Sequence, residues 1–224
     1  MSSIPLGFVD ANVLANAIIV ENELRQIRAN SLKRMTRPSK VDKRREEFFR
    51  GYEIGRPAYD LFHMLHQPMT PAPDVVTSNL AKLEVASVIA AEFKARELYR
   101  RHVPYRYWYR SQDTIKLTRE DLKEIQLSIL LFLKKMGNAI VTMNEYNLEL
   151  AERLITEFAC DTRDAILVAT AVASGYPLFI TEDERLQRKL RQFREVSVVK
   201  TQSAVDSLRS YHHQPSSTSP SPES

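Results

Sequence analysis

Four acidic residues, far apart in the chain, each stand where an expected strand ends or an expected helix begins: Asp10, Glu84, Asp164 and Asp183. Carboxylates gathered at one edge of a sheet repel one another, and such a cluster persists when a hard divalent cation neutralises it. A metal-bound water has a lowered pKa and attacks phosphorus without a covalent protein nucleophile. The four acids therefore predict a metal-dependent phosphodiesterase.

Three of these acids also have a simpler interpretation as helix caps. Asp10 precedes an expected helix, and Asp183 precedes another. Asp164 stands three residues after Asp161, an expected N-cap, at the helix end where acids are stabilised in any case. Asn12, two residues after Asp10, is placed to orient it. Each residue alone is ambiguous, and the combination favours a shared site.

Glu84 is more informative, because it is the only acid in residues 75–91. Its neighbours at helical spacing predict that it lies on the inward face of an apolar helix; they are Leu80, Leu83, Ser87 and Val88. A buried carboxylate costs several kcal/mol unless it is paired or bound to a metal. Lys82 does not share that face and is therefore not expected to pair with Glu84. The alternative to a metal ligand is a glutamate whose carboxylate reaches solvent.

Short apolar segments alternate with helical ones along the chain. The expected strands cover residues 7–10, 74–77, 139–143, 178–181 and 196–199. Continuous apolar strands separated by helices are typical of a parallel sheet covered on both faces, in which sites form at the carboxyl ends of the strands. The predicted fold class is α/β, with a short parallel sheet of about five strands.

One domain is expected over residues 1–206. A basic helical insertion is expected at about 21–73, since ten Lys or Arg and only three acids lie between Arg25 and Arg50. Two basic helical pieces, or a helix and a loop broken near Pro38, are both compatible with that segment. Residues 207–224 are rich in Ser and Pro and are expected to be a disordered tail.

Composition excludes several other classes. The one cysteine, Cys160, rules out an internal disulfide framework and is expected to be a core residue. No apolar segment is long enough for a membrane helix, and no signal peptide is evident, so a cytoplasmic protein is expected. His63 and His66 have a spacing that suits zinc, but no third ligand is evident nearby.

Four segments together resemble the PIN-domain nucleases. They are Phe8-Val9-Asp10-Ala11-Asn12, residues 80–85, residues 163–171 and residues 177–183, which ends in Thr181-Glu182-Asp183. The resemblance implies a three-layer α/β/α fold that holds Mg²⁺ or Mn²⁺ on Asp10, Glu84, Asp164 and Asp183. It also implies supporting roles for Asn12, Thr181 and Asp161, and single-stranded RNA as the substrate.

The insertion at 21–73 and the long middle helices distinguish this chain from small toxin-type PIN proteins. A toxin and a processing enzyme therefore both stay open as roles. An antitoxin-like inhibitor protein and a second copy of the chain are open candidates as partners, beside single-stranded RNA.

Residues 100–110 interleave aromatic and basic side chains. Aromatic rings stack on bases and arginines neutralise phosphates, which suits a single strand. The residues predicted to bind nucleic acid are Arg100, Arg101, Arg106, Tyr107, Trp108 and Arg110. An aromatic loop that packs on the core or at a dimer interface is the alternative.

The sequence thus predicts a Mg²⁺- or Mn²⁺-dependent endoribonuclease. A PIN-like module that binds RNA or a protein without cutting is the first alternative. A phosphatase of the haloacid-dehalogenase type is the second, but that chemistry needs an aspartate two residues after the first, where Asn12 stands.

Overall fold

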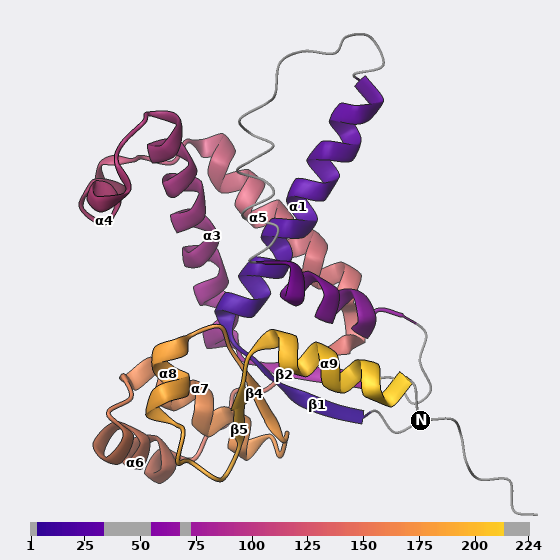
Figure 1. Ribbon diagram of the computed structural model, residues 1–224, viewed down its shortest axis with the longest axis vertical. Helices are drawn as coiled ribbons and strands as arrows, with labels where there is room; N and C mark the ends of the chain where they lie inside the picture. The colour runs from indigo at the N-terminus through magenta and orange to yellow at the C-terminus, as the bar shows by residue number, and fades with distance from the viewer. Residues whose placement is uncertain (1–3, 34–54, 68–72, 213–224) are drawn as a thin grey trace, which may run out of the picture.

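A five-stranded parallel sheet forms the centre of the molecule, with the order β3-β2-β1-β4-β5. The computed structural model describes residues 4–33, 55–67 and 73–212 (Figure 1). The strands are β1 (Ile4–Val9), β2 (Pro73–Thr77), β3 (Ile140–Thr142), β4 (Leu178–Ile180) and β5 (Ser197–Val199). The prediction of a parallel sheet of about five strands is therefore confirmed.

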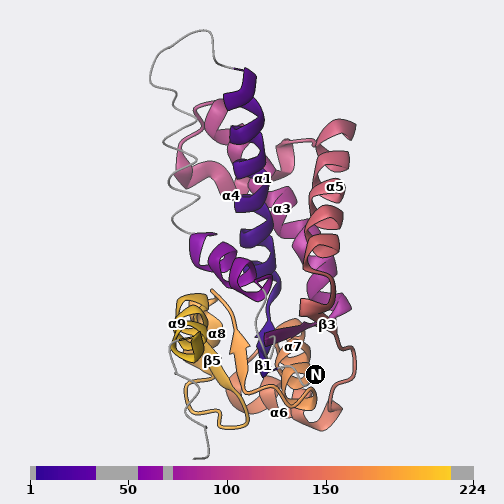
Figure 2. The same ribbon diagram turned by 90° about the vertical axis from the view of Figure 1, so that its right-hand side faces the viewer.

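Helices lie on both faces of this sheet, with α9 on one side and α6 and α7 on the other (Figure 2). The helices are α1 (Ala11–Lys33), α3 (Asn79–Arg100), α4 (Trp108–Ser111), α5 (Arg119–Met136), α6 (Leu148–Phe158), α7 (Thr162–Ala173), α8 (Glu184–Lys189) and α9 (Thr201–His212). Residues 55–65 form a further helix. This arrangement is the three-layer α/β/α fold that the sequence predicts.

Three long helices, α1, α3 and α5, extend together away from the sheet (Figures 1 and 2). We call them the helical arm. The helix at residues 55–65 packs against its base, where the ring of Phe62 meets that of Phe132 edge-on with 5.2 Å between centroids. Gly55 fits closely against α1, since an added Cβ would lie 2.7 Å from Val20 Cγ2. No helix in the described ranges is long and apolar enough to cross a membrane.

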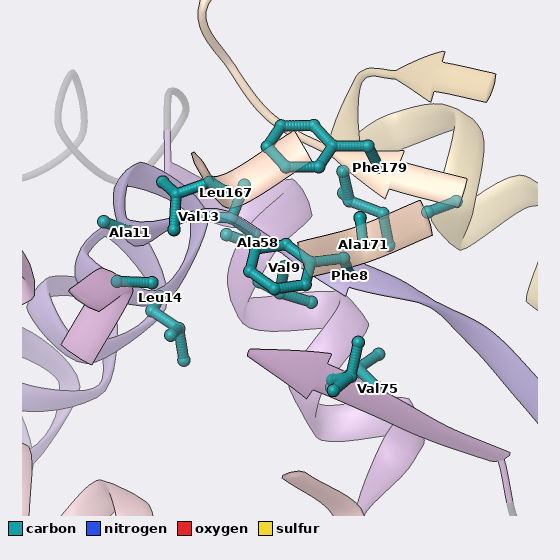
Figure 3. Close-up of a cluster of buried hydrophobic side chains, with 14 of the residues drawn as sticks. Phe8, Val9, Ala11, Val13, Leu14, Ala58, Val75, Leu167, Ala171 and Phe179 are labelled. Atoms are coloured by element: carbon teal, nitrogen blue, oxygen red, sulfur yellow. The ribbon is translucent and has the colours of Figure 1, made fainter. Parts of the chain in front are cut away.

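The core lies between the sheet and its helices (Figure 3). Phe8 of β1 stacks on Phe179 of β4, with the two rings 5.4 Å apart and nearly parallel. From α7, Leu167 and Ala171 pack into the same cluster. Cys160 is 4% exposed, which confirms it as a core residue. The apolar positions of β1 and α7 thus hold the acid-bearing ends of both elements in a rigid frame.

The basic segment is described only in part. Residues 21–33 are helical, as predicted, and they continue α1 without a break, so this part of the segment belongs to the helix that follows β1 directly. Residues 34–54, which contain the predicted break near Pro38, lie outside the described residues, as do 68–72. α1 persists because Val13, Leu14, Ala17 and Ile18 bury one face of it against the core.

The predicted boundary of the C-terminal tail at residue 207 is wrong. α9 extends to His212, and its residues Ala204, Val205 and Leu208 are buried at helical spacing. Polar Ser and Gln residues on the outer face mask this apolar stripe in the composition. Residues 213–224 lie outside the described part.

Candidate metal centre

The parallel pairing of β1 and β4 brings Asp10 and Thr181 together. Val9 is in register with Ile180, and the next residue of each strand lies at the carboxyl edge of the sheet. The backbone N–H of Asp10 donates to the carbonyl of Ile180 at 3.0 Å. Two residues far apart in sequence therefore meet at the edge where sites form in parallel sheets.

Asp10 is buried, with 6% of its surface exposed. Its Oδ1 accepts the backbone N–H of Ala11 at 2.6 Å, and its Oδ2 accepts the hydroxyl of Thr181 at 2.7 Å. Burial raises the pKa of Asp10, and the negative charge of Asp183 raises it further. Asp10 therefore caps α1 as predicted, through the bond from the Ala11 N–H to Oδ1, while the Thr181 hydroxyl holds Oδ2. Asn12 is half-buried in the first turn of α1.

Thr181 also connects Asp10 to Asp183. Its Oγ1 accepts the backbone N–H of Asp183 at 3.0 Å while donating to Asp10. Asp183 in turn caps α8, because its Oδ1 accepts the N–H groups of Arg185 at 2.7 Å and Leu186 at 3.1 Å. Both capping bonds are accepted by Oδ1, so Asp183 can cap α8 and still present Oδ2 to another ligand.

Asp164 stands in the first turn of α7. Asp161 is the N-cap of that helix, and its Oδ1 accepts the N–H of Asp164 at 2.9 Å. Burial raises the pKa of Asp164 to about 7, with further contributions from the charges of Asp161, Asp10 and Asp183. A carboxyl perturbed by three other acids shows that residues from β1, α7 and the β4–α8 connection share one electrostatic site.

Glu84 has a partner that the sequence did not reveal. Arg163 Nε lies 2.6 Å from Glu84 Oε1, and the glutamate side chain is only 15% exposed. The contact is an ion pair without hydrogen-bond geometry, since Oε1 is buried and has no hydrogen-bond partner. Burial raises the pKa of Glu84, the charge of Arg163 opposes that shift, and Asp10 and Asp161 add to it.

The face of α3 that is buried differs from the predicted one. Leu83 is 73% exposed, while the face of α3 that meets the core carries Ala81, Val85 and Ile89. Glu84 therefore lies at the border of the buried face, where it reaches the start of α7. An arginine in the first turn of a helix is disfavoured by the helix dipole, and this was the available signal for Arg163.

A family comparison agrees with this geometry. The model of the PIN domain matches residues 55–191, which is more than half of the chain. The chain belongs to the PIN domain family. The matched range contains Glu84, Asp164 and Asp183, whereas Asp10 precedes it. No curated protein and no solved structure matches the chain. PIN domains are generally nucleases, so the class supported for this chain is a nuclease.

The donor set of this PIN domain fits a hard divalent cation. All four donors are carboxylates, burial and mutual charge raise the pKa of Asp10, Glu84 and Asp164, and one buried Glu84 oxygen lacks a hydrogen bond. Oxygen ligands are those that Mg²⁺ prefers. In the conformation described, no group of three or more His, Cys, Asp or Glu side chains in residues 4–33, 55–67 and 73–212 is placed to hold one ion together. Arg163 is the group that holds Glu84.

The residues predicted to bind nucleic acid lie at the other end of α3. Sixteen residues separate Glu84 from Arg100, about 24 Å along a helix. There, Arg100 and Arg101 pair with Glu97. The segment folds into short helical turns, in which the guanidinium of Arg106 stacks on the ring of Tyr107, 4.7 Å from its centroid.

Trp108 and the histidine pair have structural contacts. Trp108 Nε1 donates to the carbonyl of Val103 at 2.7 Å, which ties the indole to its own segment. His63 stacks on Tyr59, with the ring centroids 5.9 Å apart. The structure thus brings Asp10, Thr181, Asp183 and Asp164 into one site with Glu84, and places Arg100 to Arg110 outside it.

Proposed function

We propose that this PIN domain is a Mg²⁺- or Mn²⁺-dependent endoribonuclease that hydrolyses phosphodiester bonds of single-stranded RNA. The observation that carries the proposal is the environment of Asp10. Asp10 is a buried carboxylate fixed by Thr181, and the charges of Asp164, Asp183 and Glu84 act on the same site. A fold needs no such concentration of buried acids, because isolated buried carboxylates destabilise it.

The four acids would hold the ion, and two further residues would position them. Thr181 holds Asp10 and the backbone of Asp183 through one hydroxyl. Asp161 fixes the first turn of α7 and with it Asp164. When bound, the ion supplies a water nucleophile at neutral pH and stabilises charge on the phosphate oxygens.

Single-stranded RNA as the substrate is supported by the aromatic and basic residues beyond α3. Arg106 and Tyr107 present a stacked guanidinium and ring, a combination that suits bases and phosphates of an unpaired strand. This surface follows the C-terminal end of α3, which lies about 24 Å from Glu84 along the helix, so a strand of several nucleotides is needed to contact both. Binding there would hold the RNA while cleavage occurs at the sheet edge.

The test is cleavage of an unstructured RNA by the purified full-length chain, with Mn²⁺ and with excess chelator. Asp10→Asn keeps the side-chain volume and an acceptor for the Ala11 N–H, so the fold is retained. We expect cleavage by the wild type with Mn²⁺, and a loss of at least roughly a hundredfold with chelator or in Asp10→Asn. Asp113→Asn changes an exposed aspartate in the short turn at residues 112–114, away from the acidic site, and serves as the matched control.

Chelator-resistant cleavage that survives Asp10→Asn would overturn the proposal. The alternative is a PIN domain that binds RNA without cutting it. The observation that favours this alternative is the ion pair between Arg163 and Glu84, which puts a protein cation on one of the four acids. RNA binding by the wild type, with no cleavage under any divalent cation, would select it.

A further inference from the structure

The outer face of α5 exposes large apolar side chains. Its inner face is buried in the arm through Ile125, Ser128, Phe132 and Met136. Leu127 and Leu130 are 54% and 64% exposed, and Leu131 is 40% exposed. Isolated exposed leucines are ordinary on protein surfaces, but a contiguous apolar patch marks an interaction site.

The spacing of these residues makes one stripe. Leu127, Leu130 and Leu131 are three and four residues apart, so they lie on the same side of the helix. Glu120 lies seven residues before Leu127, and Lys134 lies seven residues after it. Seven residues are nearly two turns, so all of these side chains project to the same side. The stripe has a negative residue at one end, leucines in the middle and a positive residue at the other end.

This order of charges selects both the partner and its orientation. If the same face of a second copy packs antiparallel across a two-fold axis near Leu127, each Glu120 lies opposite Lys134 of the other copy. A parallel arrangement would instead set glutamate against glutamate and lysine against lysine. A surface that complements itself in this way is what an isologous interface requires.

We propose that the outer face of α5 is the interface of a homodimer, in which two α5 helices pack antiparallel around Leu127. Lys123 then lies opposite Leu131 of the second copy, where its aliphatic stem can cover the leucine. Removal of the leucines from water stabilises the dimer, and the two Glu120–Lys134 pairs fix the register.

The location of α5 is compatible with nuclease activity. α5 belongs to the helical arm, which extends away from the sheet (Figure 1). The inference does not rest on the proposed function, because it uses no residue of the acidic site. One pair of helices is a small interface, so we expect a dimer that dissociates on dilution.

The experiment is sedimentation velocity of the full chain over a concentration series up to roughly 100 μM, without RNA. We expect the wild type to shift from monomer to dimer. Leu127→Asp places a charge at the axis and should leave a monomer. Leu148→Asp is the matched control, because Leu148 is 61% exposed on α6, and it should dimerise as the wild type does.

The charge swap separates this interface from any other. Glu120→Lys alone and Lys134→Glu alone should each weaken the dimer severalfold, since like charges then face each other. The double variant Glu120→Lys/Lys134→Glu restores opposite charges and should recover the affinity. A wild type that stays monomeric overturns the proposal, as does a Leu127→Asp variant that dimerises like the Leu148→Asp control. A double variant weaker than both single variants overturns the antiparallel register.

Discussion

Arg163 Nε lies 2.6 Å from Glu84 Oε1, so the first turn of α7 is joined by charge to the second turn of α3. Arg163 also lowers the pKa of Asp10 and of Asp164. One arginine therefore offsets the charge of three acids. The Arg163 side chain is 61% exposed, so its guanidinium can leave Glu84 for solvent without disrupting the core.

Removal of this arginine should favour metal binding. In Arg163→Gln the cation that competes for Glu84 is absent, and we expect Mn²⁺ to bind roughly two- to fivefold more tightly, the worth of an exposed ion pair. Isothermal titration calorimetry of the chelator-stripped protein measures this without RNA. The control is Arg153→Gln on α6, which breaks an exposed ion pair with Glu195. An unchanged or weaker affinity in Arg163→Gln would show that the arginine does not compete with the ion.

Thr181→Val should destabilise the protein, because it removes the hydroxyl that serves both Asp10 and Asp183. We expect a loss of about 1–3 kcal/mol in the free energy of unfolding, and a lower rate of RNA cleavage. Urea denaturation measures the first effect. The loss should be larger than in the control Thr170→Val, whose buried hydroxyl donates only within its own helix, to Ile166.

Thr181→Ser keeps the hydroxyl and should retain most of the stability and activity. Equal losses of stability in Thr181→Val and Thr170→Val would mean that the hydrogen bond from Thr181 to Asp10 contributes no more than that of an ordinary buried threonine hydroxyl.

The metal-free protein should lose stability as the pH rises from about 4 to about 7. Burial and nearby acids raise the pKa of Asp164 from its ordinary value of 3.8 to about 7, so the folded state holds a proton that the unfolded state releases. The contribution of Asp164 to the free energy of unfolding is fully present below pH 3.8 and is lost as the pH rises through about 7. Asp10 acts in the same direction.

Thermal melts of chelator-treated protein across this pH range measure the effect. Asp164→Asn should flatten part of the slope and raise the melting temperature at pH 8, whereas Asp113→Asn should leave both unchanged. A wild type that gains stability over the same range would contradict this assignment.

The sequence predicted the elements whose signals are local. Asp161 caps α7 as expected, because a capping side chain needs only the next three residues. The parallel sheet was predictable because its strands are short, continuous apolar segments separated by helices. The pairing of Arg163 with Glu84 was not predictable, since it depends on how α3 and α7 approach each other.

Two errors have the same physical origin. Leu83 was placed inside because apolar residues surround Glu84, but the packing of α3 in the arm sets the phase of the helix and leaves Leu83 exposed. Residues 207–212 of α9 are predicted as part of a tail because Ser and Pro are frequent from residue 207 on, although Leu208 is buried. In both helices the tertiary contacts, and not the local residues, decide which face is inside.

Gly7→Ala should disturb both the sheet and the site. An added Cβ would lie 2.8 Å from Leu178 Cβ and 2.8 Å from its carbonyl oxygen, so β1 and β4 must separate. That separation moves Asp10 away from Thr181. We expect a loss of about 1–3 kcal/mol in stability, together with weaker cleavage. Gly137→Ala is the control: its φ of +52° strains an alanine, but no atom lies within 4 Å of the added Cβ.

That control should cost about 1 kcal/mol and leave cleavage per folded molecule unchanged. If Gly7→Ala is no worse than Gly137→Ala, the close approach of β1 to β4 does not position the site.

The surface beyond α3 should contribute to RNA affinity and not to the chemical step. Replacing Arg106 and Arg110 by alanine removes two charges from the segment that follows α3, whose last residue, Arg100, lies about 24 Å from Glu84 along the helix. We expect weaker RNA binding and a salt dependence whose slope falls by about 1.4, or about 0.7 for each phosphate contact in a single strand. Fluorescence anisotropy over a salt series measures both. The control, Arg153→Ala, removes an arginine of α6 and should change neither.

The rate at saturating RNA should be the same for wild type and the Arg106→Ala/Arg110→Ala variant, because the acids at the sheet edge are untouched. A variant that keeps full affinity would assign this segment to packing. A variant that loses rate at saturation while keeping affinity would show that it acts on the acidic site, against the separation that α3 imposes.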